Sequence, residues 1–425
     1  MPVVPAMFVV FFLAIVLGLP IFCVLAAASL AGLVIWGGIP LEVIPQRLFT
    51  GIDSFSLIAI PFFMIGGLVM ERGGLAKKLL DFSSIFVGRI RGGLAVVDVI
   101  ACMFFGGISG AASAEAAAVG SVIIPDMIKK GYNDDFTVAL TVAAASIGVV
   151  IPPSIPMVIY GVLTDQSVGD LFIGGAIPGI LIGLSLIAVS LVIAWKRNYP
   201  REDFRGLRHV ALGILRGFPV LFTIIIIFGG IFLGVFTPTE AAAAAAVYAL
   251  ILALFVYHTV TFKDLIRIFE KSGTMAAVVA LLIASSNIFS WILATQQVPA
   301  ILRDTMLAIT TNKYLILAMI LVIYLIAGCI MDLTPAMIIL VPIFLPLINQ
   351  LGISLLHFGI ITVVALAIGL YTPPVGTALA VGLAIGKVPV GRVTKALVPF
   401  FLAMVAILAL VTYVPQVSLY LLSLR

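Results

Sequence analysis

The stretches GVVIPPS at residues 148–154 and GLYTPPVGT at residues 369–377 decide the fold of this chain. Each lies inside a long apolar segment, and each contains a Pro-Pro pair. Two consecutive prolines remove two backbone amide donors, so helical hydrogen bonding stops there and carbonyls such as those of Gly148 and Gly369 should lack partners. We therefore expect two broken helices, over about residues 135–163 and 356–386.

The composition places these broken helices in a membrane. Of the 425 residues, 63% are hydrophobic and 10% are charged, against about 45–50% and 25% in soluble domains. A crossing needs about 20 apolar residues, so the chain accommodates on the order of ten crossings and no soluble catalytic domain. We predict an all-α polytopic membrane protein whose first apolar run is a retained span. Its net charge of +5 comes from scattered loop residues, not from a nucleic-acid-binding patch.

Hydropathy, with Gly, Pro and charge as punctuation, places the individual spans. The expected spans are 5–18, 21–38, 55–70, 135–163, 171–195, 212–235, 239–258, 273–295, 356–386 and 396–420. Two further apolar regions, 92–130 and 314–350, are interrupted by FFGGISGAASAEAAAVG at 104–120 and by AGCIMDLTPA at 327–336. We interpret both regions as re-entrant helical hairpins.

The order of these elements occurs twice, at one fixed offset of 221 residues. The ungapped matches are Gly107 with Gly328, Pro125 with Pro346, Gly131 with Gly352, Gly148 with Gly369, Pro152 and Pro153 with Pro373 and Pro374, and Pro178 with Pro399. Such agreement indicates a duplication. We place repeat 1 at residues 1–205, with scaffold helices at 1–70, and repeat 2 at residues 206–425, with scaffold helices at 212–258.

Basic residues predict how the two repeats are oriented. With five crossings and one hairpin in each repeat, the repeats must be inverted. If the polar linker 196–216 is cytoplasmic, 19 of the 23 Lys and Arg residues fall on that side, as the positive-inside rule requires. Arg47, Arg303, Lys313 and Arg425 are left outside. Both termini should then face the periplasm.

Inverted repeats with broken helices are typical of secondary transporters, whose sites lie where the breaks meet. Na⁺ prefers several oxygen ligands, and freed carbonyls with Ser or Thr hydroxyls supply them. We predict two Na⁺ cages, each formed by a hairpin tip and its own Pro-Pro break. The first uses Ser109, Gly110, Ser113, Gly148 and Pro152, and the second uses Gly328, Asp332, Thr334, Gly369 and Thr372.

Amides at the half-helix N-termini, and nearby polar side chains, are candidates to bind an anionic substrate. The substrate candidates are Ser154, Ser285, Ser286, Asn287, Gly376 and Thr377. The cluster at 285–287 either lines the substrate cavity or bonds across helices, and Asp332 either shapes an ion site or caps its hairpin.

Other polar residues favour structural roles. For Asp98 and Glu115 we expect structural hydrogen bonds, and for Glu240 a helix cap. Catalysis is not expected, because the three histidines have no paired nucleophile, and no GxxxxGK[ST] loop is present.

Five segments carry a family resemblance over nearly the whole chain. They are SGAASAEAAAVGSVIIPDMIKKGY at 109–132, IPPSIPMVIYG at 151–161, FTPTEAAAAAA at 236–246, MDLTPAMIILVPIFLPL at 331–347 and YTPPVGTAL at 371–379. The chain resembles the large membrane subunit of tripartite ATP-independent periplasmic (TRAP) transporters, the DctM-like family. The resemblance implies an elevator-type, Na⁺-coupled importer of organic acids in the bacterial inner membrane.

The same resemblance implies two protein partners, a separate small four-helix membrane subunit and a periplasmic substrate-binding protein. Within the family, a sialic-acid type is favoured over a C4-dicarboxylate type, although no residue decides it. Two alternatives stay open: a single-component divalent-anion/sodium symporter that needs no binding protein, and a passive channel or membrane scaffold.

Overall fold

The computed structural model describes residues 3–40, 42–85, 87, 90–201 and 207–424. This part of the chain contains helices and one isolated bridge, between Arg91 and Arg201, but no strand, and the all-α prediction is confirmed. The predicted repeat boundary at 205/206 and the linker residue Arg205 lie outside the described residues, as does Arg89.

The helices of the first half of the chain are α1 (Val3–Val16), α2 (Ile21–Trp36), α3 (Val43–Ile52), η1 (Phe55–Ile58), α4 (Ala59–Arg72), α5 (Leu75–Ile85), α6 (Gly93–Ser109), α7 (Ala112–Ala118), α8 (Gly120–Lys129), α9 (Asp134–Ala145), η2 (Ser146–Val149), α10 (Ile155–Thr164) and α11 (Val168–Lys196). Those of the second half are α12 (Leu207–Phe232), α13 (Pro238–Ile251), η3 (Leu252–Val256), α14 (Phe262–Thr295), α15 (Val298–Ile309), α16 (Lys313–Ile330), α17 (Leu333–Gln350), α18 (Leu355–Gly369), α19 (Thr377–Gly386), α20 (Val390–Tyr413) and α21 (Gln416–Ser423).

Within the described residues, seven helices are long and apolar enough to cross a membrane. Several of the remaining apolar helices are shorter because the chain breaks them. α10 and α19, at ten residues each, are half-helices that begin just after the Pro-Pro pairs, and at about 1.5 Å per residue neither spans a bilayer alone. The structure thus describes a multi-pass membrane protein with two broken helices.

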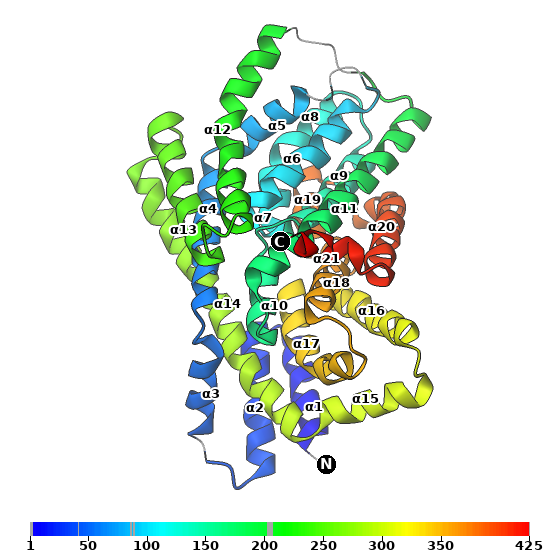
Figure 1. Cartoon of the computed structure of the whole chain (residues 1–425). Helices are drawn as coiled ribbons and strands as arrows, with labels where there is room; N and C mark the ends of the chain where they lie inside the picture. The colour runs from blue at the N-terminus through cyan, green and yellow to red at the C-terminus, as the bar shows by residue number, and fades with distance from the viewer. Residues whose placement is uncertain (1–2, 41, 86, 88–89, 202–206, 425) are drawn as a thin grey trace.

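The helices pack in two groups, each of which draws on both halves of the sequence. In the first group, α14 packs on α2, α3 and α4, and α13 packs on α4 and α12. In the second group, α9 packs on α6, α19 and α20, and α18 packs on α16, α17 and α20 (Figure 1). Both hairpins, α6–α8 and α16–α17, belong to the second group.

Three helices were not expected from hydropathy. α3, α5 and α15 are short and amphipathic, with apolar residues along one face, so their mean hydropathy does not mark them as spans. α14 begins at Phe262 rather than near residue 273, because Thr261 and Asp264 form a capping box at its start. Each of these segments is therefore longer or more regular than the sequence indicated.

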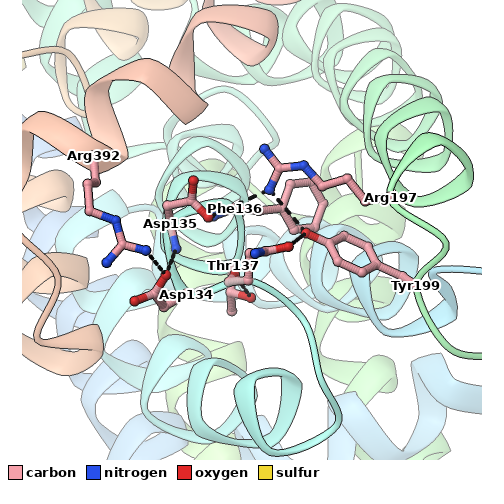
Figure 2. Close-up of polar contacts among 8 residues, drawn as sticks. Asp134, Asp135, Phe136, Thr137, Arg197, Tyr199 and Arg392 are labelled. Atoms are coloured by element: carbon pink, nitrogen blue, oxygen red, sulfur yellow. Dashed lines mark hydrogen bonds and ion pairs between the residues drawn. The ribbon is translucent and has the colours of Figure 1, made fainter.

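One end of the second helix group is tied together by charged side chains from distant parts of the sequence (Figure 2). Arg392 of α20 contacts Asp134 at 2.6 Å, and Arg197 lies 3.6 Å from Asp135, both at the start of α9. The Tyr199 hydroxyl donates to Asn133, and burial raises the pKa of this phenol. Burial lowers the pKa of Arg197, but its contacts with Tyr199 and Asp135 outweigh this and raise it overall.

These contacts show that Arg197 of the linker and Arg392 lie at the same end of the molecule, as the charge pattern requires. Arg91 lies there too, because it donates to the Asn198 side chain at 2.9 Å. α3 and α15 lie at the opposite end (Figure 1). Which end faces the cytoplasm stays a prediction.

Candidate ion and substrate sites

The first hairpin reverses direction at Gly110, directly against the first Pro-Pro break. Gly110 adopts a left-handed conformation, with φ of +61°, that side chains other than glycine rarely accept. A Cβ atom at Gly110 would lie 2.8 Å from the carbonyl oxygen of Pro153. Farther down the hairpin, Gly106 packs on the backbone of Gly148. The tip and the break are thus in backbone contact, which small residues alone permit.

Three buried oxygen atoms near this contact are poorly satisfied within the described residues. The Ser109 hydroxyl has no hydrogen-bond partner there, and the one donor beside the two carboxyl oxygens of Glu115 is the weak Cys102 thiol. Glu115 is fully buried on α7, and one of its oxygens would lie 1.8 Å from a Cβ at Gly148. Buried polar groups are normally paired, so these oxygens are candidates to bind a water molecule or an ion.

The remaining residues of the first predicted cage occupy different environments. Ser113 is exposed, whereas Gly148 and Pro152 are buried. The Gly148 carbonyl accepts no hydrogen bond from the described part of the chain, as the sequence predicted.

The second hairpin meets the second break through Gly328 and Gly369. A Cβ at Gly369 would lie 2.4 Å from the carbonyl carbon of Gly328. The Val375 amide donates to the Cys329 carbonyl at 3.3 Å, so the break is also hydrogen-bonded to the first arm of the hairpin. The tip residue Asp332 accepts a hydrogen bond from Thr377 at 3.1 Å and makes no cap to α17. Asp332 therefore links the tip to the start of α19.

One expectation at this break is wrong. The Gly369 carbonyl has a partner, because the Thr372 amide donates to it at 3.1 Å in a tight turn. The Thr372 hydroxyl donates to the Ile368 carbonyl at 2.6 Å, and Thr334 is half-buried. A carbonyl and a hydroxyl each keep a second lone pair, so these residues can still accept a cation.

Three of the predicted substrate residues are part of the breaks. The Ser154 hydroxyl donates to the Val149 carbonyl and accepts from the Met157 amide, so it caps α10. Gly376 lies against the Leu370 and Thr372 carbonyls, and Thr377 bonds to Asp332. These residues surround the broken backbone rather than an open cavity.

The polar cluster at residues 285–287 borders a cavity of about 570 Å³. The cavity lies between α3 and α14 of the first helix group and α10 and α17 of the second. Ser286 and Asn287 line it, whereas Ser285 is buried beside it and is not part of the lining. This observation favours the cavity-lining alternative over bonding between helices.

The structure also shows what the other polar residues contact. Asp98 accepts from Thr141 at 2.7 Å and from the Cys102 thiol at 3.8 Å, which confirms its structural role. Glu240 and Thr237 form the expected cap of α13. Glu115 is fully buried and interacts with the Cys102 thiol, so its structural role stays a prediction.

Sequence reasoning missed Arg47 and Trp291, which both line the cavity. Arg47 is one of four basic residues that the charge pattern left outside the cytoplasm, and that isolation was the available signal. Trp291 follows the 285–287 cluster by about one helical turn, on the same face of α14.

Comparison with known proteins identifies the family. The model for "Tripartite ATP-independent periplasmic transporter, DctM component" matches residues 8–417. The chain therefore belongs to this family of transporter permeases, which confirms the family resemblance and the expectation that the chain is not an enzyme.

The names of the relatives mention different transported compounds. The chain is 40% identical to the C4-dicarboxylate TRAP transporter large permease protein DctM of Pseudomonas aeruginosa, over 88% of this chain and 87% of that one. It is 38% identical to the sialic acid TRAP transporter large permease protein SiaM of Vibrio cholerae, over 95% of each. It is 41% identical to the isethionate TRAP transporter permease protein DctMQ of Oleidesulfovibrio alaskensis, over 98% of this chain but 66% of that relative's length.

A solved structure shares the fold. The YdaH transporter of Alcanivorax borkumensis, described as having an unusual topology, superposes with a TM-score of 0.64 over 88% of each chain, at 16% identity. At this identity the likeness concerns the fold alone.

Proposed function

We propose that this chain is the Na⁺-coupled permease subunit of a TRAP transporter that imports a small organic acid across the bacterial inner membrane. The observation that carries the proposal is the group of buried oxygens from Ser109 and Glu115 where the first tip meets its break, which have no donor within the described residues other than the Cys102 thiol. A buried carboxylate without a partner is costly, and a bound monovalent cation removes that cost.

The residues at both tip–break contacts fit Na⁺. At the first contact, Ser109 and Glu115 supply oxygens, and the Gly148 carbonyl accepts no hydrogen bond from the described residues. At the second contact, Asp332 supplies a carboxylate and Gly369 and Thr372 supply carbonyl and hydroxyl oxygens. A bound Na⁺ supplies positive charge in a medium of low dielectric, which favours the binding of an anion nearby.

The two helix groups support an elevator mechanism. Each tip packs on a break of its own group, so the two predicted cages can move as one body. The group that contains α14 and α13 would stay fixed as a scaffold. Inverted repeats 1–205 and 206–425 would explain why both halves of the chain contribute a hairpin and a broken helix.

We further propose two protein partners, a separate small four-helix membrane subunit and a periplasmic binding protein that delivers the acid. The names "large permease protein" of two relatives support the first partner. The relatives' names cover a sialic acid, C4-dicarboxylates and isethionate, so the proposal at this level is an organic acid. Within the family we favour a sialic acid, although no residue of the sequence decides it.

The test is uptake into proteoliposomes that contain the complete system, with each component omitted in turn. We expect uptake that requires an inward Na⁺ gradient, the small subunit and the binding protein. Uptake that persists without the binding protein would favour the single-component symporter, and uptake that ignores the Na⁺ gradient would favour a channel.

Replacing Ser109 by Ala tests the first cage. Because the hydroxyl makes no hydrogen bond within the described residues, its loss should leave the melting temperature unchanged. If it binds Na⁺, the Na⁺ concentration for half-maximal uptake should rise about three- to tenfold, since one such contact contributes about 0.5–1.5 kcal/mol. Ser423→Ala, at the end of α21, is the control. An unchanged Na⁺ dependence would show that this hydroxyl is not a ligand.

Cysteine labelling tests the predicted orientation. Asn198 and Ser423 are exposed, so each is replaced by Cys in a chain whose three native cysteines are Ala. In intact cells, a membrane-impermeant maleimide should label position 423 after outer-membrane permeabilisation, whereas position 198 should react only after the inner membrane is opened. Labelling of position 198 from outside would reverse the topology.

A further inference from the structure

The cavity between the two helix groups contains one basic side chain. Arg47 of α3 lines it, and the Arg47 guanidinium carbon lies 5.1 Å from the centre of the Trp291 ring. Trp291 in turn stacks on Trp36, with ring centres 5.9 Å apart. Two stacked indoles thus support the guanidinium from one side, an arrangement that favours a cation over the ring face.

Arg47 has no ion pair and its side chain makes no hydrogen bond within the described residues. Its five N–H donors are available to a ligand, and the planar guanidinium matches the oxygen geometry of an acid group. A half-buried arginine that is held by stacking alone is preorganised to bind such a group.

A stripe of α14 completes the wall of the cavity. Ser290 follows Ser286 by four residues, and Trp291 follows Asn287 by four, so these side chains line neighbouring positions on one side of the helix. The Asn287 side chain makes no hydrogen bond with the described residues. These groups can donate to and accept from hydroxyl or amide groups on a ligand.

Two carboxylates restrict the charge of that ligand. Asp53 and Asp165 also line the cavity and are exposed. A second acid group on the ligand would find no further Lys or Arg in the cavity lining and would be repelled by these carboxylates. A hydroxyl group, by contrast, could donate to either of them.

We propose that this cavity is a reception site for the transported anion, with Arg47 as the residue that binds its acid group. This inference rests on the proposed function and adds the ligand class, a monoanionic organic acid that carries hydroxyl or amide groups. The tip residues do not line this cavity, and the half-helix α10 runs from the first break to its wall. With the predicted orientation, the site precedes the cages along the path of the substrate.

The stacked tryptophans provide a direct binding signal. The chain contains three Trp residues, and Trp195→Phe leaves only Trp36 and Trp291, the pair beneath Arg47. In this background, the fluorescence of the purified full chain is titrated with N-acetylneuraminate, isethionate or succinate as sodium salts, with sodium chloride as the blank. We expect a saturable change with a hydroxyl-bearing monoanion and weaker binding of succinate.

Arg47→Gln should weaken the fluorescence-detected binding at least about tenfold, because a charge-assisted contact is lost, and Arg47→Lys should restore part of it. Arg303→Gln is the matched control, since Arg303 lies on α15, outside the cavity lining, and pairs with Asp304. Gel filtration confirms that each variant is folded. If no anion alters the fluorescence, or if Arg47→Gln binds like its parent, the proposal is wrong. If succinate binds most tightly, the ligand class is wrong.

Uptake measurements separate this inference from the proposed function. Na⁺-driven uptake with an unchanged KM in Arg47→Gln would overturn the reception site and leave the function standing. A wild-type chain that binds an acid in the fluorescence assay but shows no Na⁺-driven uptake would overturn the function and leave the site standing.

Discussion

Gly369→Ala should produce the largest loss of stability and uptake of any single methyl addition to the second tip–break contact. The added Cβ would lie 2.4–2.5 Å from the carbonyl carbon, Cα and oxygen of Gly328. These are backbone atoms of another helix, so no side chain can rotate away. We expect a cost of about 3 kcal/mol, the upper end of what overpacking usually causes, measured as a lower melting temperature, and loss of uptake.

Two other glycines give a graded comparison. At Gly328 the nearest atom to an added Cβ, the Gly369 Cα, is 3.2 Å away, so Gly328→Ala should be milder. Gly391→Ala, on α20, meets nothing within 4 Å and should behave like wild type. If all three variants melt together, the helices are not held in this close contact.

Glu115→Gln should weaken Na⁺ binding while it strengthens the fold. The substitution keeps the volume of the side chain but removes a buried acid group whose one donor within the described residues is the weak Cys102 thiol, so the melting temperature should rise. If this carboxylate faces Na⁺, the Na⁺ concentration for half-maximal uptake should rise about tenfold or more, since contacts with charged groups contribute about 1.5–3 kcal/mol.

For the control variant we expect the opposite change in stability and no change in Na⁺ dependence. Glu240 is an exposed cap of α13, so Glu240→Gln should lower stability by up to about 1 kcal/mol and leave the Na⁺ dependence unchanged. A Glu115→Gln protein that melts at a lower temperature, with an unchanged Na⁺ dependence, would indicate a purely structural carboxyl group.

The sequence predicted those parts of the fold that depend on a short, recognisable sequence pattern. Pro152-Pro153 and Pro373-Pro374 end helices wherever they occur, and both hairpins turn within the predicted tips at Gly110 and at Asp332. Amphipathic helices such as α3 and α15 give a weaker hydropathy signal, because their apolar and polar residues average to a neutral hydropathy. They were therefore missed.

The candidate site was harder to predict because it depends on contacts between distant residues. Sequence alone gave Glu115 an ordinary hydrogen-bonding role, and only the structure shows that its buried carboxyl group lies beside Gly148, with the Cys102 thiol as its one donor among the described residues. Arg47 and Trp291 are 244 positions apart in the chain, and no local pattern joins them. Asn287 was a candidate, but the cavity that it lines exists only when α3 packs on α14.

The buried carboxylate of Glu115 has a consequence for the electrical behaviour of the transporter. Because Glu115 is part of the first hairpin, its charge travels with the moving body in the proposed elevator. If the carboxyl group stays ionised, a bound Na⁺ would cancel its charge on the inward stroke, and the charge would be uncompensated on the empty return stroke. A membrane potential that is negative inside pulls a negative body outward, with about 2.3 kcal/mol for each charge moved through 100 mV. The voltage of the cell would then accelerate the resetting of the carrier rather than the delivery of its cargo.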